Sequence, residues 1–205
     1  MSSIIVDGLV LPLAVGGHPA LDFCNTRAGW NAPDPKEYLR SYQHLVVWAR
    51  EAGLLQPAGA ERLIRNSADA PAVANGVLDS ALELREAAYR MALGPHSADD
   101  FDLVGTQARA ARTAMTLRAT HARPGPIAVW ALAGERIDTP LLAVAAQLDD
   151  LLCSPLSGVV AACPGRGCGW LFADPRRRRR WCDMAVCGNR AKARRHAERL
   201  AATSR

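Results

Sequence analysis

Residues 163–192 read CPGRGCGWLFADPRRRRRWCDMAVCGNRAK, and this stretch holds two cysteine pairs of equal spacing. Cys163 and Cys168 form the first pair, Cys182 and Cys187 form the second, and 13 residues separate them. Four thiolates are soft ligands that close a tetrahedral zinc site without an open coordination position. The pattern predicts one structural zinc ion; a rubredoxin-like iron site and four ordinary buried thiols are the alternatives.

The surroundings of the cysteines predict a tight loop followed by a helix. Glycines on both sides of Cys168 permit a loop whose N–H groups turn toward sulfur. The second pair is expected just before, or within, the first turn of a helix that includes residues 192–200. Asp183 and Asn189 are competing N-caps for this helix.

The formal net charge of the chain is +5, and it is unevenly distributed. From residue 163 onward, 12 basic residues stand against three acidic ones, whereas residues 1–162 carry a net charge of −4. Such segregation predicts an anionic partner for the tail, with a solvated basic patch as the alternative. The residues expected to contact nucleic acid are Arg176, Arg177, Arg178, Arg179, Arg180, Arg190, Lys192, Arg194 and Arg195.

Three aromatic side chains lie within the cysteine-rich stretch. Trp170, Phe172 and Trp181 are able to stack on unpaired bases, but so small a module needs a core, which we expect them to form. The other two cysteines, Cys24 and Cys153, stand alone in apolar segments, and this predicts ordinary core residues.

Residues 1–157 have the pattern of a helical domain, with abundant Ala and Leu and only 5% aromatic residues. The helices are expected at residues 35–53, 57–66, 71–93, 97–116 and 139–152. Short strands are expected at residues 9–15, 116–121, 127–133 and 159–162, with a turn at 123–125. We therefore predict a mainly α (α+β) fold: a helical domain with a small β element over residues 1–157, and a zinc module over residues 158–205.

A second group of polar residues lies near the N-terminus, in apolar surroundings. It consists of His18, Asp22, Asn25, Thr26 and Arg27. One interpretation is a helix start with local side-chain hydrogen bonds. The other is a site for a small-molecule effector or a partner.

The tail resembles the CGNR zinc finger, which takes its name from the tetrapeptide found here at residues 187–190. The similarity covers residues 163–164, 168–172, 180–182, 184 and 187–192. The segment LDFCNT at residues 21–26 resembles the opening of the ABATE domain, the usual partner of this finger. The resemblance implies a treble-clef-like finger in a bacterial, stress-linked transcription regulator with a zinc-dependent DNA-binding tail. The family's loop between the cysteine pairs usually contains Asp-x-Ser-Arg, whereas this chain has Asp174-Pro175 and then five arginines.

The predicted function is that of a zinc-dependent, DNA-binding transcription regulator that is not an enzyme. RNA binding or an adaptor role on RNA polymerase is the alternative. An enzyme in residues 1–162 is a weaker one, because neither a nucleophile–base pair nor a phosphate loop is evident. A homodimer is expected, since one finger reads few bases. No signal peptide or membrane span is recognised, which predicts a cytoplasmic protein.

Overall fold

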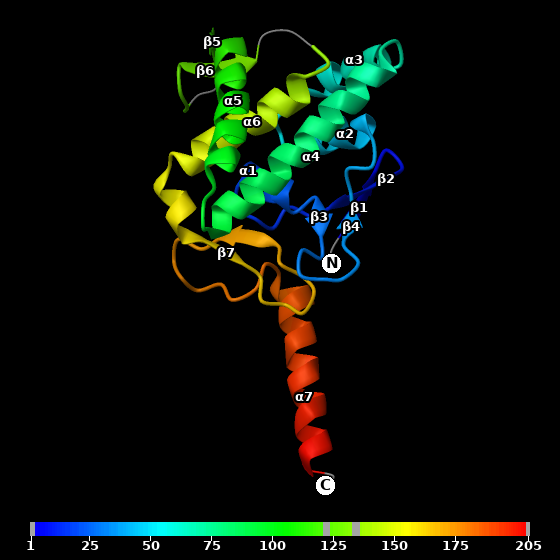
Figure 1. Cartoon of the computed structure of the whole chain (residues 1–205), viewed down its shortest axis with the longest axis vertical. Coiled ribbons are helices and arrows are strands. Elements are labelled where there is room, and N and C mark those ends of the chain that lie inside the picture. Colours follow the sequence, from blue (N-terminus) through cyan, green and yellow to red (C-terminus); the bar gives the residue numbers. More distant parts are fainter. Residues whose placement is uncertain (1–2, 121–123, 133–135, 204–205) are drawn as a thin grey trace.

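The computed structural model describes residues 3–120, 124–132 and 136–203, and within these the chain forms seven α-helices and four two-stranded antiparallel sheets (Figure 1). The α-helices are α1 Pro19–Cys24, α2 Tyr42–Glu51, α3 Pro57–Ser67, α4 Pro71–Leu93, α5 Ala98–Ala114, α6 Thr139–Leu152 and α7 Asn189–Thr203. The sheets pair β1 Ser3–Val6 with β2 Leu9–Pro12, β3 Arg27–Ala28 with β4 Lys36–Glu37, β5 Met115–Ala119 with β6 Ala128–Leu132, and β7 Val160–Ala162 with β8 Leu171–Ala173. A 3-10 turn, Pro155–Val159, precedes β7, and a π-helical turn, Met184–Gly188, precedes α7. The predicted mainly α fold class is confirmed.

Most helices begin where the sequence signals predict. Proline occupies the first turn of α3, α4 and α6, where its missing N–H leaves no hydrogen bond unmade. The Ser97 side chain accepts a hydrogen bond from the N–H of Asp100 and caps α5. The strands expected around residues 116–121 and 127–133 form the β5–β6 hairpin. His121, Arg123 of the predicted turn and Ala133 lie outside the described residues.

The helix predicted from residue 35 is wrong at its start. Residues 36–37 form strand β4 instead, and α2 begins only at Tyr42, after the cap Ser41. The N–H of Leu39 donates to the Glu37 carboxylate at 2.7 Å, so this segment is held by side-chain contacts rather than helical ones. Tyr38 and Leu39 are both buried, but they belong to different clusters of the protein.

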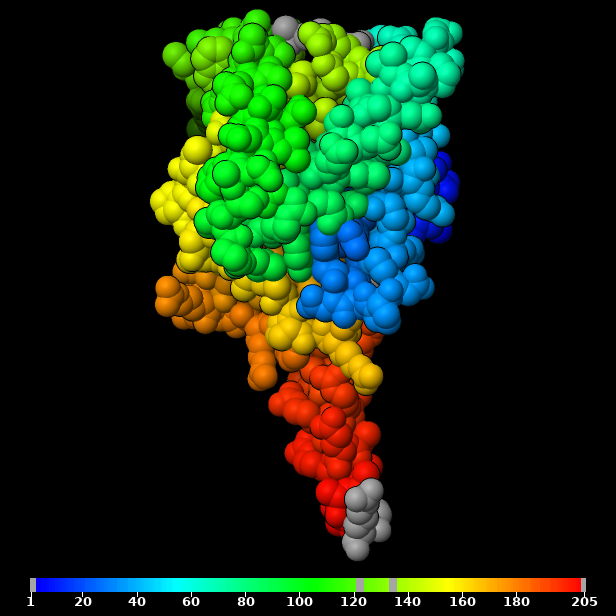
Figure 2. Space-filling model, in the orientation of Figure 1, coloured from blue at the N-terminus to red at the C-terminus, as the bar shows by residue number. Residues whose placement is uncertain are grey.

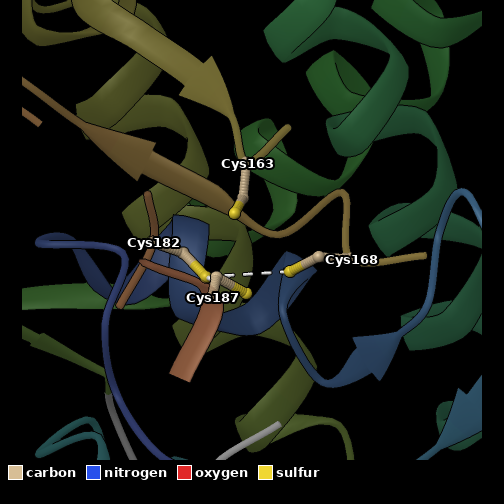
Figure 3. A group of neighbouring side chains, drawn as sticks. All are labelled: Cys163, Cys168, Cys182 and Cys187. Atoms are coloured by element: carbon tan, nitrogen blue, oxygen red, sulfur yellow. Dashed lines mark hydrogen bonds between the residues drawn. The ribbon is translucent and has the colours of Figure 1, made fainter. Parts of the chain in front are cut away.

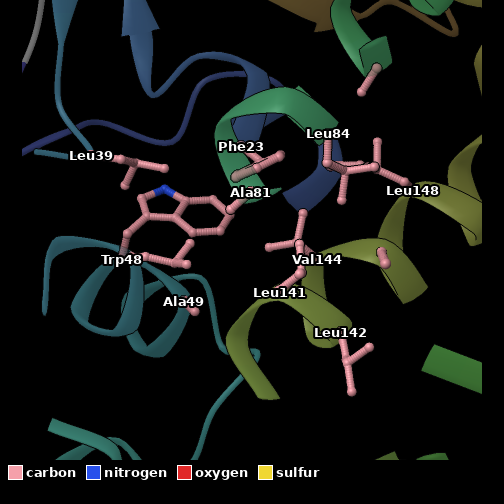
Figure 4. Close-up of a cluster of buried hydrophobic side chains, with 14 of the residues drawn as sticks. Phe23, Leu39, Trp48, Ala49, Ala81, Leu84, Leu141, Leu142, Val144 and Leu148 are labelled. Carbon is pink, nitrogen blue, oxygen red and sulfur yellow. The ribbon is translucent and has the colours of Figure 1, made fainter. Parts of the chain in front are cut away.

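The main core lies where α1, α2, α4 and α6 meet (Figure 4). Phe23 on α1 contacts Trp48 on α2 with ring centroids 5.5 Å apart. Leu84 from α4 and Val144 from α6 are fully buried against them. Burying each such side chain stabilises the fold by about 1.5–3 kcal/mol. These four helices therefore contribute a large share of the stability of the fold.

Two residues at the C-terminal end of α6 contact α5. Asp149 and Asp150 oppose the helix dipole there, and both accept hydrogen bonds from Arg112. Cys153, at the C-cap of the same helix, is exposed, so the prediction that it is a core residue is wrong. Leu151, in the last turn of α6, is still buried in the core, and the chain reaches the surface at Cys153. Cys24 is buried as predicted.

Helix α7 stands apart from the other helices. It projects from the body like a stalk (Figures 1 and 2). Ala191 is its one buried residue, and every later residue up to Thr203 is exposed. Its polar sequence supplies no apolar face with which to return to the core.

Candidate metal centre

Four buried cysteine side chains converge between the base of α7 and the helical body (Figure 3). The Sγ atoms of Cys163, Cys168, Cys182 and Cys187 all lie within 4.8 Å of one another. Two of the sulfur–sulfur distances are 3.7 Å and 3.8 Å. A regular tetrahedron with Zn–S bonds of about 2.3 Å has edges of about 3.8 Å, so the four sulfurs fit a zinc ion.

The first two ligands are placed by the β7–β8 hairpin. The N–H of Cys163 donates to the carbonyl of Trp170, and the N–H of Cys168 donates to that of Gly165, each at 2.8 Å. A Cβ atom at Gly165 would lie 3.1 Å from the sulfur of Cys187, so a glycine lets the loop approach that ligand.

The other two ligands depend on the π-helical turn before α7. The Asp183 side chain accepts from the N–H of Ala185 at 2.7 Å, and the Asp183 carbonyl accepts from the N–H of Cys187 at 3.0 Å. Asp183 is thus the cap of the helical segment, which decides between the two caps left open by the sequence. Asn189 already lies in the helix and donates to the carbonyl of Ala185.

The crowded sulfurs favour a bound cation. Hydrogen bonding among the sulfurs raises the pKa of Cys168 to about 12 and also raises the pKa of Cys182, whereas it lowers the pKa of Cys163. Without a cation the four cysteines therefore do not all ionise together, since adjacent thiolates repel each other. A divalent ion that prefers thiolate replaces the remaining protons. No oxygen or nitrogen ligand completes the set in the described residues, so the site is a closed structural one for a single zinc ion.

The metal centre is joined to the helical body by hydrogen bonds. The buried amide of Asn25 accepts from the N–H of Leu171 at 2.7 Å and donates to its carbonyl at 2.9 Å. The N–H of Trp30 donates to the carbonyl of the ligand Cys168, and Tyr89 on α4 donates to that of Gly169. The first half of the zinc module is thus fixed to α1 and α4.

Apolar contacts also cross between the module and the body. The cluster around the cysteines includes Ala28 and Tyr38 from the body and Trp170 and Phe172 from the module. Trp170 and Phe172 are about 1–2% exposed, and Trp181 packs against them, so the prediction that these aromatics form a core is confirmed. The helical body and the zinc module share this core. The predicted domain boundary between residues 157 and 158 therefore separates two parts that are in close contact.

Two residues of the N-terminal polar group, His18 and Asp22, form hydrogen bonds with nearby backbone N–H groups, as the first of the two interpretations expects. His18 caps α1 by accepting from the N–H of Ala20 at 3.2 Å. Asp22 accepts from the N–H groups of Val15 and Gly16 at 2.8 and 2.7 Å. Burial raises the pKa of Asp22, and these donors act in the opposite direction.

The last two members of that group belong to a charged network. Thr26 accepts from buried Arg85 at 3.0 Å, and Arg85 also makes a two-pronged pair with Glu37. Arg27 pairs with Glu86, the residue next to Arg85. Sequence reasoning missed Arg85, Glu86 and Glu37. The available signal was a cation on the apolar side of α4, between Ala81 and Ala88, because a buried cation needs a partner.

The five consecutive arginines differ in what they contact. Arg179 donates to the carbonyls of Val15 and Cys182 and lies 4.7 Å from the centre of the Phe172 ring. Arg180 lies over Trp181 at 5.3 Å. All five arginines are exposed, and Arg176, Arg177 and Arg178 lie within the turn that Asp174 closes by accepting from the N–H of Arg179.

The basic residues predicted on the tail helix are brought together on the stalk. Arg190, Lys192, Arg194 and Arg195 are all exposed on α7, and Glu198 is the single acid on this helix. Arg194 lies 3.9 Å from Glu198, a solvated i,i+4 contact of little energetic weight. The helix therefore presents several cations and one acid to solvent.

Comparison with known families agrees with both parts of the molecule. Residues 160–200 match the CGNR zinc finger, the segment that contains the four sulfurs. Residues 17–155 match the ABATE domain, described as "Putative stress-induced transcription regulator". No curated protein matches the chain. None of the helices in the described ranges has the length and apolar character required to cross a bilayer. Since the ABATE match spans more than half of the sequence, the chain belongs to the ABATE family and carries a CGNR zinc finger at its C-terminal end.

Proposed function

We propose that this protein is a transcription regulator whose zinc centre presents α7 to duplex DNA. The observation that carries the proposal is the stalk itself. Its 15 residues correspond to about 22 Å of helix, and the diameter of a helix with side chains, about 10–12 Å, matches the width of a major groove, about 12 Å. The basic residues on it supply contacts to phosphate.

The low intrinsic stability of α7 also supports the proposal that this helix binds DNA. An isolated helix of about 15 residues is marginal in water, and this one lacks a packed face beyond Ala191. The zinc centre holds its base through Cys187, two residues before Asn189. Contacts with DNA would stabilise the remaining turns. Zinc then acts on DNA binding indirectly, by fixing where the helix starts.

The alternative, single-stranded RNA, is less well supported. Proteins that bind single strands stack bases on exposed aromatic side chains. Trp170 and Phe172 are buried in the cluster around the cysteines, which leaves only Trp181 partly accessible in this module. A duplex contacted through its backbone needs no such surface. Dimerisation, effector binding, a cytoplasmic location and the lack of catalytic activity stay predictions.

The test is a titration of zinc-loaded full-length protein with a labelled 20-base-pair duplex of mixed sequence, repeated from low to high salt. Five basic residues of α7 meeting phosphates predict a slope of log affinity against log salt of about −4 to −5. Substituting Arg194→Gln together with Arg195→Gln is expected to reduce the slope by about two, because each contact contributes about 0.9.

Arg65→Gln is the matched control, since Arg65 is an exposed helical arginine far along the chain from the finger. It is expected to leave affinity and slope unchanged. Failure of the wild-type protein to bind duplex DNA at low salt would overturn the proposal. Stronger binding to single-stranded RNA or to RNA polymerase than to the duplex would favour the adaptor role instead.

A further inference from the structure

A small pocket lies between the first cysteine loop and the base of α7. Its volume is about 220 Å³, and its lining residues are Gly165, Arg166, Cys187, Arg190, Ala191 and Arg194. We call it the arginine pocket. Three of the six lining residues are cations, and none is an acid. Arg166 was not among the residues that the sequence predicts for nucleic-acid contact.

The three guanidinium groups reach the pocket from two sides. Arg190 and Arg194 are four residues apart on α7, so they project from one face of the helix. Arg166 comes from the loop between Cys163 and Cys168. Zinc holds this loop and the helix together, so metal binding fixes the width of the pocket.

The cations of the arginine pocket lack internal partners. Within the part of the chain that the structure describes, the side chains of Arg166 and Arg190 form no hydrogen bond, ion pair or ring contact, and the side chain of Arg194 has only its long contact with Glu198. A zinc ion with four thiolates carries a charge of −2, which offsets two of the three cations. A net positive charge remains at the pocket mouth, where an anion would be attracted.

The donor geometry favours phosphate among anions. Each guanidinium presents a planar fork of N–H donors that matches two phosphate oxygens. Arginines arriving from two directions can bind different oxygens of the same group. A monovalent ion such as chloride offers no comparable set of acceptors.

We propose that the arginine pocket binds one backbone phosphate of duplex DNA and thereby sets the angle at which α7 enters the groove; this rests on the proposed function. Arg199 is nine residues beyond Arg190, which places it half a turn around the helix. Arg195 lies near that second side. One face of α7 thus holds a phosphate of one strand, while the other face is directed across the groove.

Figure 2 agrees with this arrangement. In that view the loop around residue 165, in gold, and the arginine-rich loop, in orange, lie on opposite sides of the base of α7. The arginine-rich loop contributes Arg178 to a separate pocket that Met184 also lines. A duplex that receives α7 would meet positive charge on both flanks of the helix.

The experiment is a double-mutant cycle on full-length, zinc-loaded protein, with the 20-base-pair duplex as the probe. Arg166→Gln and Arg190→Gln are each expected to weaken binding about threefold to tenfold at moderate salt, and the double variant is expected to lower the salt slope by about 0.9, the value for one phosphate. Because both residues bind the same phosphate, the double variant is expected to lose less than the product of the single losses.

Arg65→Gln again serves as the control, and zinc content with the thermal midpoint shows whether each variant is folded. If Arg166→Gln releases zinc, Arg194→Gln takes its place in the cycle, since Arg194 lies about two turns beyond the last cysteine. Two results would overturn the proposal for the arginine pocket while leaving the proposed function intact, provided that the wild-type protein binds the duplex. The first is that the single variants bind as tightly as the control, and the second is that the losses of the single variants are fully additive. Absence of wild-type binding would overturn the proposed function itself.

Discussion

The two halves of the zinc module are built in opposite ways. The β7–β8 hairpin buries Leu171 and Trp170 almost completely and hydrogen-bonds to the helical body through Asn25. Helix α7 buries only Ala191 and leaves the rest of its surface in solvent. Each half supplies two of the four cysteines. The comparison indicates that one half fastens the module while the other is available for a partner.

Zinc joins these two halves, and this makes metal binding a condition for the placement of α7. Cys163 and Cys168 belong to the fastened half, whereas Cys182 and Cys187 lead into the stalk. Without the metal, the hairpin keeps its contacts with the body, whereas the segment before α7 keeps weaker links such as the hydrogen bonds of Arg179 to the carbonyls of Val15 and Cys182. The free energy of metal binding is therefore the main term that positions the stalk.

The largest effect is expected from removing a zinc ligand on the stalk side. Cys182→Ser should abolish stoichiometric zinc binding and DNA binding, because structural zinc contributes about 10–16 kcal/mol in isolated fingers. Elemental analysis and circular dichroism would show loss of the metal and of helix. Cys153→Ser, an exposed cysteine on α6, is the control and should retain one zinc ion. A Cys182→Ser protein that keeps its zinc would contradict the assignment of the ligands.

A smaller effect is expected at the contact between the body and the hairpin. Asn25→Leu keeps side-chain volume but leaves the buried N–H and carbonyl of Leu171 unpaired, which should lower the free energy of unfolding by about 2–4 kcal/mol. Urea denaturation measures this loss. The salt slope of DNA binding should not change, since α7 is untouched.

The matched control for that variant is Asn66→Leu, at an exposed position of α3. It is expected to stay within about 0.5 kcal/mol of the wild-type stability. Equal stabilities of the Asn25 and Asn66 variants would show that the module is not fastened at this point.

The smallest effects on stability and on DNA binding are expected from two substitutions in the arginine run. Arg179→Gln removes donors to the carbonyls of Val15 and Cys182 and should cost about 1 kcal/mol of stability, as these bonds are partly exposed. Arg177→Gln should leave stability unchanged but lower the salt slope if this arginine meets a phosphate. Thermal unfolding and the salt titration of both variants check this. The reverse pattern would mean that their roles are exchanged.

The sequence predicts those features of the molecule that depend on residues close together in the chain. Spacing identifies the four zinc ligands, and proline or serine at the first turn locates the starts of α3, α4 and α5. The arginine run is predicted only as a single basic patch. The contact that distinguishes Arg179 from its exposed neighbours depends on the Val15 carbonyl, which is 164 positions away in the chain.

The parts that sequence could not predict rest on contacts between distant residues. Asn25 and Leu171 are 146 positions apart, and no periodicity reports such a pair. Residues 35–41 have apolar spacing typical of a helix. Tyr38 is drawn into the cluster around the cysteines while Glu37 pairs with Arg85, and these tertiary contacts outweigh the local preference.

The measurement that tests the central claim most directly is hydrogen exchange of the zinc-loaded protein with and without the 20-base-pair duplex. The amides of α7 are solvent-exposed in a marginal helix, so they should exchange fast in the free protein and slow markedly with DNA. The loop around Arg166 should follow, while α4, α6 and the β7–β8 hairpin stay unchanged. Protection confined to the helical body, with α7 unaffected by DNA, would contradict the division of the module into a fastened half and a binding half.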